Sequence, residues 1–306
     1  MPLAQGVHAD VPMSVYVADP CETPSLSAGI MHTIVTRSPA HARIEHPRLN
    51  PAYQHENSSR AEIGTAVHAA ILGGERVVYA PPEFEDWRKK AAQEFRDQAR
   101  GEGRTPLLAE QRLLVEAAAE AGRKRLEKLA CGKTMEVEST IVWSEGQTWK
   151  RGRPDVIVRE LDSVIDIKTM EAVDPEAWIR SSLAAGGYDI QSAHYLAGLR
   201  ALGVLSDAGS FIFLLVEIEP PYSTALVALD PEYADFARGR CALATRVWAR
   251  CLASGNWPGY DPRIHWASPP PWLVGGFAER AAEDRQAAAA AGAAVLGMQS
   301  RDAAHG

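Results

Sequence analysis

Residues 151–169, with the sequence RGRPDVIVRELDSVIDIKT, constrain the fold more than any other stretch of the chain. Two short runs rich in β-branched residues, Val156–Val158 and Val164–Ile167, flank the polar tetrad Arg159–Asp162. This pattern predicts a β-hairpin with a four-residue loop.

The register expected for this hairpin gathers charged side chains. If Val158 pairs with Ser163, then Asp155 faces Asp166 across the strands, and Asp166 and Lys168 share one face because strand side chains alternate. Directly opposed residues have Cβ atoms about 5 Å apart. Two carboxylates so close resist joint ionisation, and one ammonium is too little to offset them. A divalent cation such as Mg²⁺, which prefers oxygen ligands, is the natural candidate.

The cluster suits hydrolysis of a phosphodiester. A lysine beside a metal could orient or deprotonate an attacking water, or stabilise charge that develops on a phosphate. The alternative interpretation of these residues alone is a surface hairpin with a solvated Asp–Lys pair.

Pro154-Asp155, ten intervening residues and then Asp166-Ile167-Lys168 resemble the PD-(D/E)xK nuclease signature. The arrangement RPD-x10-DIKT is most similar to the RecE-type (exonuclease VIII-like) phage recombination exonucleases. The resemblance implies a restriction-endonuclease-like α/β core, a mixed β-sheet flanked by helices. It also implies that Asp155, Asp166 and the Ile167 carbonyl hold Mg²⁺ (or Mn²⁺), and that Asp155, Asp166 and Lys168 are catalytic.

A second motif lies in the predicted helix 59–72. Gly64-Thr65-Ala66-Val67-His68 resembles the GTxxH motif of the same nucleases, which implies that His68 is a metal ligand and Thr65 a substrate-binding residue. Without the resemblance, His68 is a boundary residue of an apolar helix face. Gly64 would let this helix approach the sheet or DNA closely.

A third motif is the pair Gln191 and Tyr195, which share a helix face because they are four residues apart. GYDIQSAHY resembles the QxxxY motif of RecB-like nucleases in its RecE-type form. The resemblance implies that both side chains line the active site and contact substrate or orient the lysine. Taken alone, the pair would be ordinary surface patterning.

Three further charged residues are candidates. Arg151 and Arg153 could clamp phosphate oxygens of the substrate or neutralise the acidic cluster. Glu138, on the alternating strand predicted over 134–143, could be an acidic metal ligand or a group behind the ligands. It could equally be an exposed strand glutamate.

The rest of the sequence predicts that the chain has an N-terminal arm, a nuclease domain and a C-terminal tail. Residues 1–24 contain four prolines and no periodicity, which indicates a flexible arm. Residues 25–266 form the expected nuclease domain. Within it, a helix starts at Thr105-Pro106, and the apolar run 210–218 is a central strand buried on both faces. Residues 267–306 are Pro-rich and then Ala-rich, which is typical of a final helix or a partly disordered extension.

Composition narrows the function classes. The net charge of −7 counts mildly against DNA binding, although a local basic surface suffices, and a ring-shaped oligomer can keep its positive channel inside. The four cysteines form no CxxC pair, so neither an iron–sulfur cluster nor a zinc site is expected. No secretory signal and no membrane-spanning apolar run is evident, and we expect a cytoplasmic protein without membrane contact.

The resemblance implies 5′→3′ digestion of double-stranded DNA ends, with the single-stranded product passed to a RecT-like annealing protein. A toroidal homo-oligomer is implied by analogy. Two alternatives stay open: a RecB-like or endonucleolytic enzyme of another pathway, and a non-catalytic module that binds DNA ends. The intact Asp–Asp–Lys set argues against the last.

Overall fold

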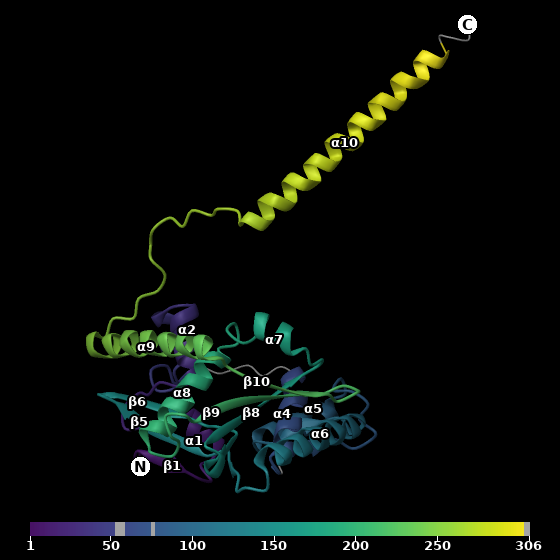
Figure 1. Ribbon diagram of the computed structural model, residues 1–306. Coiled ribbons are helices and arrows are strands. Elements are labelled where there is room, and N and C mark those ends of the chain that lie inside the picture. Colours follow the sequence, from purple (N-terminus) through teal and green to yellow (C-terminus); the bar gives the residue numbers. More distant parts are fainter. Residues whose placement is uncertain (53–58, 75–76, 303–306) are drawn as a thin grey trace. The chain divides into compact units, whose positions relative to one another are not determined.

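The computed structural model describes residues 1–52, 59–74 and 77–302, and the chain separates into two compact units. Residues 1–260 form the unit that carries the sheets and the candidate site (Figure 1). Residues 261–306 form the other unit, whose helix α10 spans Pro271–Asp302. The first unit thus ends shortly before the boundary predicted at residue 266, and the tail takes the helical alternative.

The central sheet has five strands in the spatial order β10-β9-β8-β7-β4. Their bounds are β10 Thr224–Ala228, β9 Ser210–Glu217, β8 Ser163–Met170, β7 Val156–Val158 and β4 Glu136–Val137. Strands β8 and β9 are parallel, and the other neighbours are antiparallel. The expected mixed sheet is confirmed, and β9 is central and buried as predicted.

Strands β7 and β8 form the predicted hairpin. Val158 pairs with Ser163 and Val156 with Ile165, which confirms the expected register. The loop is a short 3-10 turn, η2 (Arg159–Leu161), followed by Asp162 at a φ of 49°. An aspartate tolerates this left-handed conformation better than most residues do.

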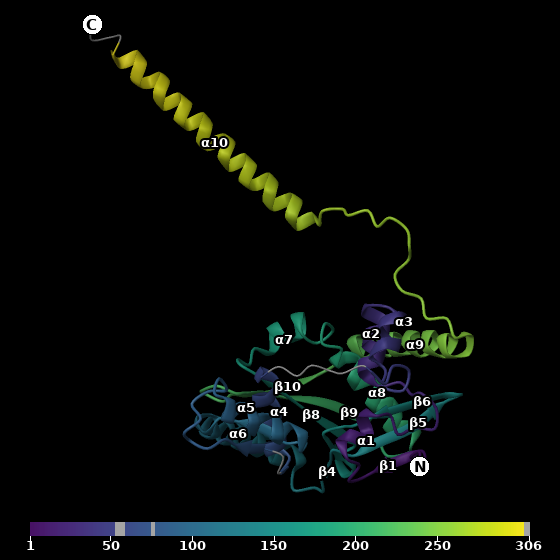
Figure 2. The same ribbon diagram turned by 180° about the vertical axis from the view of Figure 1, so that it is seen from behind.

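Helices cover both faces of the sheet (Figures 1 and 2). Ile165 and Ile167 of β8 pack with α4 (Ser59–Ile71) and α6 (Arg112–Ala130) on one face. Val164 packs with α7 (Pro175–Ser181) and α8 (Tyr188–Ala201) on the other. Asp166 and Lys168 therefore belong to the α8 face. The helices of this unit are α1 Met13–Val17, α2 Ala28–Thr36, α3 Pro39–Glu45, α4 Ser59–Ile71, α5 Lys90–Gly101, α6 Arg112–Ala130, α7 Pro175–Ser181, α8 Tyr188–Ala201 and α9 Pro231–Ser254.

The N-terminal residues are built into the fold, and the prediction of a flexible arm over 1–24 was wrong. Strand β1 (Gly6–His8) pairs antiparallel with β5 (Thr140–Glu145), which also pairs with β6 (Thr148–Gly152). Helix α1 follows, and Asp19 is buried. Sequence periodicity missed this segment because its elements are too short to show any.

Two further predictions need correction. The strand predicted over 134–143 is broken at Glu138, whose φ is 47°. As a result, β4 belongs to the central sheet and β5 to the three-stranded sheet β1-β5-β6. The helix predicted from Thr105 starts only at Arg112. Residues Thr105–Leu107 form β3, which pairs in parallel with β2 (Val77–Tyr79), and a 3-10 turn, η1 (Ala109–Gln111), follows. Proline at position 106 is tolerated because β3 is an edge strand.

Within the described residues, no helix combines the length and the apolar character that crossing a bilayer requires.

Candidate active site

Asp166 lies at the centre of the charged cluster. Its side chain is fully buried on β8, where the Lys168 ammonium lies 2.5 Å from Oδ2. Gln191, on α8, donates from Nε2 to Asp166 Oδ1 at 2.8 Å. The alternation of β8 and the α8 layer above it thus bring Asp166, Lys168 and Gln191 together.

Asp155, just before β7, joins the hairpin to helix α4. Its Oδ2 accepts from the Ile167 backbone N–H at 2.7 Å and lies 2.9 Å from Nε2 of His68. Helix α4 comes this close to β8 because residue 64 is glycine: a Cβ there would lie 2.7 Å from Thr169 Oγ1. The structure therefore shows the close approach to the sheet expected for Gly64.

The buried charges perturb one another. Burial, and then the nearby Asp155 carboxylate, raise the pKa of Asp166 to about 6. Burial alone would raise the pKa of Asp155 too, but His68 and Lys168 outweigh it and the pKa falls below its usual value. Burial would lower the pKa values of His68 and Lys168, but the two carboxylates outweigh it and raise both. The raised pKa of Asp166 thus reflects burial first and the neighbouring Asp155 carboxylate second.

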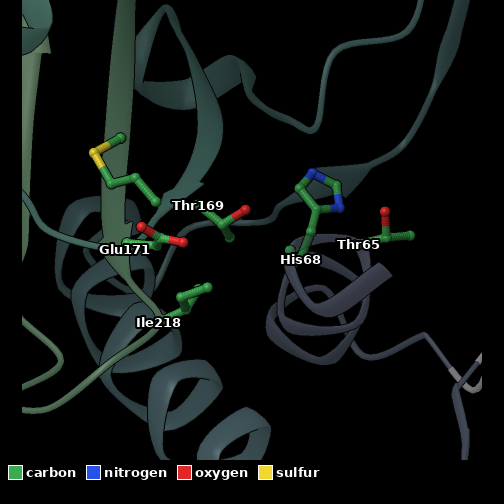
Figure 3. A pocket seen from close by; sticks show the side chains of 7 residues that line it. Thr65, His68, Thr169, Glu171 and Ile218 are labelled. Atoms are coloured by element: carbon green, nitrogen blue, oxygen red, sulfur yellow. The ribbon is translucent and has the colours of Figure 1, made fainter. Parts of the chain in front are cut away.

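Two cavities meet at His68. The larger, about 470 Å³, lies between α4 and the end of β8, with Thr65 and His68 on one side and Thr169 and Glu171 on the other (Figure 3). The smaller, about 280 Å³, is more enclosed, and its lining includes Thr65, His68 and Asp155. Thr65 lines both cavities, and its role in substrate binding stays a prediction.

Tyr195 lies one helical turn beyond Gln191, is buried and lines the smaller cavity. Tyr16 and Arg153 line the same cavity as Tyr195. Burial raises the pKa of Tyr195 well above its ordinary value, so this phenol stays protonated. Of the QxxxY pair, Gln191 therefore contacts Asp166, and Tyr195 lines the smaller cavity together with Asp155.

The two arginines predicted to clamp phosphate are buried and bind the N-terminal segment. Arg151 donates to Ser25 and lies 3.3 Å from Asp19, so its guanidinium is directed away from the carboxylate cluster. Arg153 donates to the Val11 carbonyl at 2.8 Å and lies 3.4 Å from Glu138. The phosphate-clamp prediction for Arg151 needs correction, because internal partners hold its head group. Arg153 and Glu138 do line the smaller cavity.

The donor chemistry of the cluster fits a divalent cation. Two carboxylates, the His68 imidazole and the Ile167 carbonyl are ligands that hard or borderline cations accept. In the described residues no three His, Cys, Asp or Glu side chains stand ready to hold an ion. Lys168 lies close to Asp166 Oδ2 without a well-directed hydrogen bond. A cation would offset the repulsion between the Asp155 and Asp166 carboxylates, which adds to burial in raising the pKa of Asp166.

Tyr188 is a residue that sequence reasoning missed. The Lys168 ammonium lies 4.8 Å from the centroid of the Tyr188 ring, and that ring stacks on Trp178 at 5.5 Å. Tyr188 is the first residue of α8 and lies three residues before Gln191. This closeness to the QxxxY motif was the only feature of the sequence that pointed to it. The ring face holds the ammonium beside Asp166.

A family model described as "PDDEXK-like domain of unknown function" matches residues 35–265. A search of curated proteins finds no match. Among solved structures, a candidate exonuclease from Eubacterium rectale is similar, with 12% identity, a TM-score of 0.51, and coverage of 82% of this chain and 92% of that one. A phage-related exonuclease from Haemophilus somnus 129PT has 13% identity, a TM-score of 0.32, and coverage of 76% and 96%.

The fold and the ordered motifs define a domain of the PD-(D/E)xK nuclease class, which confirms the expected class and fold. Nucleases of this class generally use divalent metal ions. The chain belongs to the family of PDDEXK-like domains whose model covers residues 35–265.

Proposed function

We propose that this protein is a metal-dependent deoxyribonuclease that digests linear double-stranded DNA from its ends. The observation that carries the proposal is the convergence of His68, Asp155, Asp166 and Lys168 in one cluster. His68 lines both cavities and Asp155 lines the smaller one. Two carboxylates with perturbed pKa values beside a lysine in a cleft are typical of a hydrolytic centre.

The chain's own residues would divide the work. Lys168, held by Asp166 and Tyr188, would orient the attacking water or stabilise charge on the phosphate. Gln191 fixes the Asp166 carboxylate from the opposite side. Asp155, Asp166, His68 and the Ile167 carbonyl would hold Mg²⁺, with Mn²⁺ as the other suitable ion. A bound divalent ion supplies a Lewis acid for the scissile phosphate and activates water.

The finer activity rests on the resemblance. RPD-x10-DIKT and GYDIQSAHY support a RecE-type enzyme, and so 5′→3′ polarity, a single-stranded product passed to a RecT-like annealing protein, and a toroidal homo-oligomer. The role is then recombination by strand annealing. The principal alternative is an endonuclease or RecB-like nuclease with the same chemistry.

Digestion of linear and covalently closed circular duplex DNA with Mg²⁺ tests the proposal. We expect linear DNA to be degraded and circular DNA to persist, and a label at the 5′ end to be released first. Equal cutting of circles would favour an endonuclease. If the protein binds DNA ends but cuts no DNA, it is a non-catalytic module that binds DNA ends.

Lys168→Ala tests the catalytic assignment. We expect cleavage to be abolished while DNA binding and thermal unfolding stay close to those of the unmodified protein. Lys124→Ala is the matched control, because this lysine is largely exposed on α6 and far along the chain from the cluster. Retained cleavage by Lys168→Ala would exclude the role given to Lys168.

A further inference from the structure

The smaller cavity has a wall that comes from outside the range matched by the family model. Met13 and Tyr16 of helix α1 line it, opposite Ala69 and Leu72 of the α4 region. We propose that this cavity binds the terminal nucleotide of the DNA strand being cut, and that α1 is part of that binding site. The inference rests on the proposed function and assigns it an end-recognition site.

The α1 wall is fixed to the catalytic region by specific contacts. Arg153 donates to the Val11 carbonyl at 2.8 Å, immediately before α1. Tyr16 lines the cavity together with Tyr195, and the Arg151 guanidinium lies 5.7 Å from the centroid of the Tyr16 ring. Both arginines are buried, so these contacts are shielded from solvent. The wall is therefore preorganised, as a binding site requires.

The size of the cavity fits one nucleotide. Its volume of about 280 Å³ lies just below the range of about 300–1,000 Å³ that is typical of small-molecule pockets. A double helix cannot enter such a space, but one unpaired nucleotide can. Selecting a strand end in this way requires only the last base pair to open.

The chemistry of the lining fits a nucleobase. Met13 and Leu72 offer apolar surface, and the aromatic side chains of Tyr16 and Tyr195 are part of the same lining. Aromatic side chains are what proteins use to pack against bases without regard to sequence. The Arg153–Glu138 ion pair adds polar surface to the lining. Mixed apolar, aromatic and polar surface of this kind is what pockets for unpaired bases use.

The position of the cavity connects it to the chemistry. Thr65 and His68 line both cavities, and Asp155 lines the smaller one. A strand that enters through the larger, more open cavity passes His68 and ends in the more enclosed one. The phosphodiester next to the terminal nucleotide then lies beside the carboxylates. This arrangement explains why ends would be preferred over internal bonds.

Met13→Trp tests the site by filling it. The Met13 side chain is partly exposed, so the helix tolerates a larger residue there. Val17→Trp is the matched control, because Val17 is on the same helix, is 56% exposed and lines neither cavity. Thr105→Trp fills the cavity from β3 and serves as a second, independent variant. Thermal unfolding of all three establishes that each is folded.

The probe is deoxyadenosine 5′-monophosphate, with binding measured by calorimetry. We expect millimolar or tighter binding to the unmodified protein and to Val17→Trp, and binding at least about tenfold weaker in the two filling variants. We expect kcat/KM on linear duplex DNA to fall by about tenfold or more in the same two variants.

The failure of this inference and that of the proposed function give different results. If the unmodified protein digests DNA and both filling variants, once folded, match it in digestion and in nucleotide binding, the cavity assignment is overturned. The same holds if the unmodified protein binds no nucleotide at millimolar concentration. If it binds the nucleotide through this cavity but cuts no DNA, the cavity assignment stands and the nuclease proposal fails.

Discussion

Nε2 of His68 lies 2.9 Å from Oδ2 of Asp155, and this contact ties helix α4 to the β7–β8 hairpin. The imidazole comes from one layer of the domain and the carboxylate from the sheet. Any change that moves α4 away from β8 therefore changes the spacing of the candidate ligands. The packing of α4 against the sheet is thus part of the site.

Gly64→Ala should destabilise the protein and lower its activity together. The new Cβ would lie 2.7 Å from Thr169 Oγ1, so the Thr169 side chain, α4 or β8 must shift, at a cost of about 1–3 kcal/mol in the free energy of unfolding. Urea unfolding measures the first effect and DNA digestion the second. Adding Thr169→Ala should restore much of the stability, because the next atom, Thr169 Cβ, is 3.7 Å away.

Gly29→Ala provides the control for that comparison. It lies in helix α2, and a Cβ there meets no atom within 4 Å. Alanine is the better helix former, so this change should be neutral or stabilising by up to about 1 kcal/mol. Equal behaviour of the two variants would contradict the close approach described for Gly64.

Gln191→Ala should lower activity by about 10–100-fold without unfolding the domain. The change removes the donor to Asp166 Oδ1 and leaves a buried carboxylate oxygen without that partner. Single-turnover cleavage of linear DNA measures the effect. Gln98→Ala, on the exposed surface of α5, should digest DNA normally. Full activity of Gln191→Ala would show that Asp166 needs no such support.

Asp19 should make the protein sensitive to acid. Burial alone would raise its pKa, but His46, Arg151 and Ser25 outweigh burial and lower the pKa from 3.8 to about 2. A carboxyl with a lowered folded-state pKa stabilises the fold above its unfolded-state pKa, and this contribution is lost as the pH falls from about 4 to 2. The shift corresponds to about 2 kcal/mol at neutral pH.

The measurement is the difference in unfolding free energy between the unmodified protein and Asp19→Asn across that pH range. We expect a clear difference at pH 7 that shrinks toward pH 2, since other carboxyls titrate equally in both proteins. A difference that stays constant with pH would show that the Asp19 contribution is not electrostatic.

Removal of divalent ions with a chelator should abolish cleavage, and Mg²⁺ or Mn²⁺ should restore it. Metal that binds only the folded chain raises stability by about 2.7 kcal/mol at one hundred times its Kd. We expect thermal unfolding to show this shift in the unmodified protein and in Asp207→Asn, whose side chain is in an exposed loop. Asp155→Asn should show little shift. Equal shifts in all three would place the metal elsewhere.

Local sequence patterns predicted the part of the site that one hairpin and one helix determine. The pairing of β7 with β8 follows from two short β-branched runs, so Asp166 and Lys168 could be assigned to one face. The i,i+4 spacing of Gln191 and Tyr195 likewise follows from helix geometry. The GTxxH motif also indicated that α4 lies at the site. The close approach of Gly64 in this helix to Thr169 could not be predicted from the pattern of apolar residues.

Contacts between distant parts of the chain were beyond such patterns. Arg153 reaches Val11 and Arg151 reaches Ser25, each more than one hundred residues away in the sequence. Nothing near either arginine indicates that partner, so a phosphate was the simplest expectation. The left-handed backbone of Glu138 was equally hidden, because an alternating pattern continues through it.

The pairing of β1 with β5 decides how the protein should be produced for experiments. A recombinant fragment trimmed to residues 35–265 would lose β1, α1, Asp19 and Ser25. Arg151 and Arg153 would keep their positive charges in the interior after losing acceptors, and breaking a buried pair in this way costs about 3–5 kcal/mol. Residues 1–260 are the appropriate limits for a truncated version that has to stay folded.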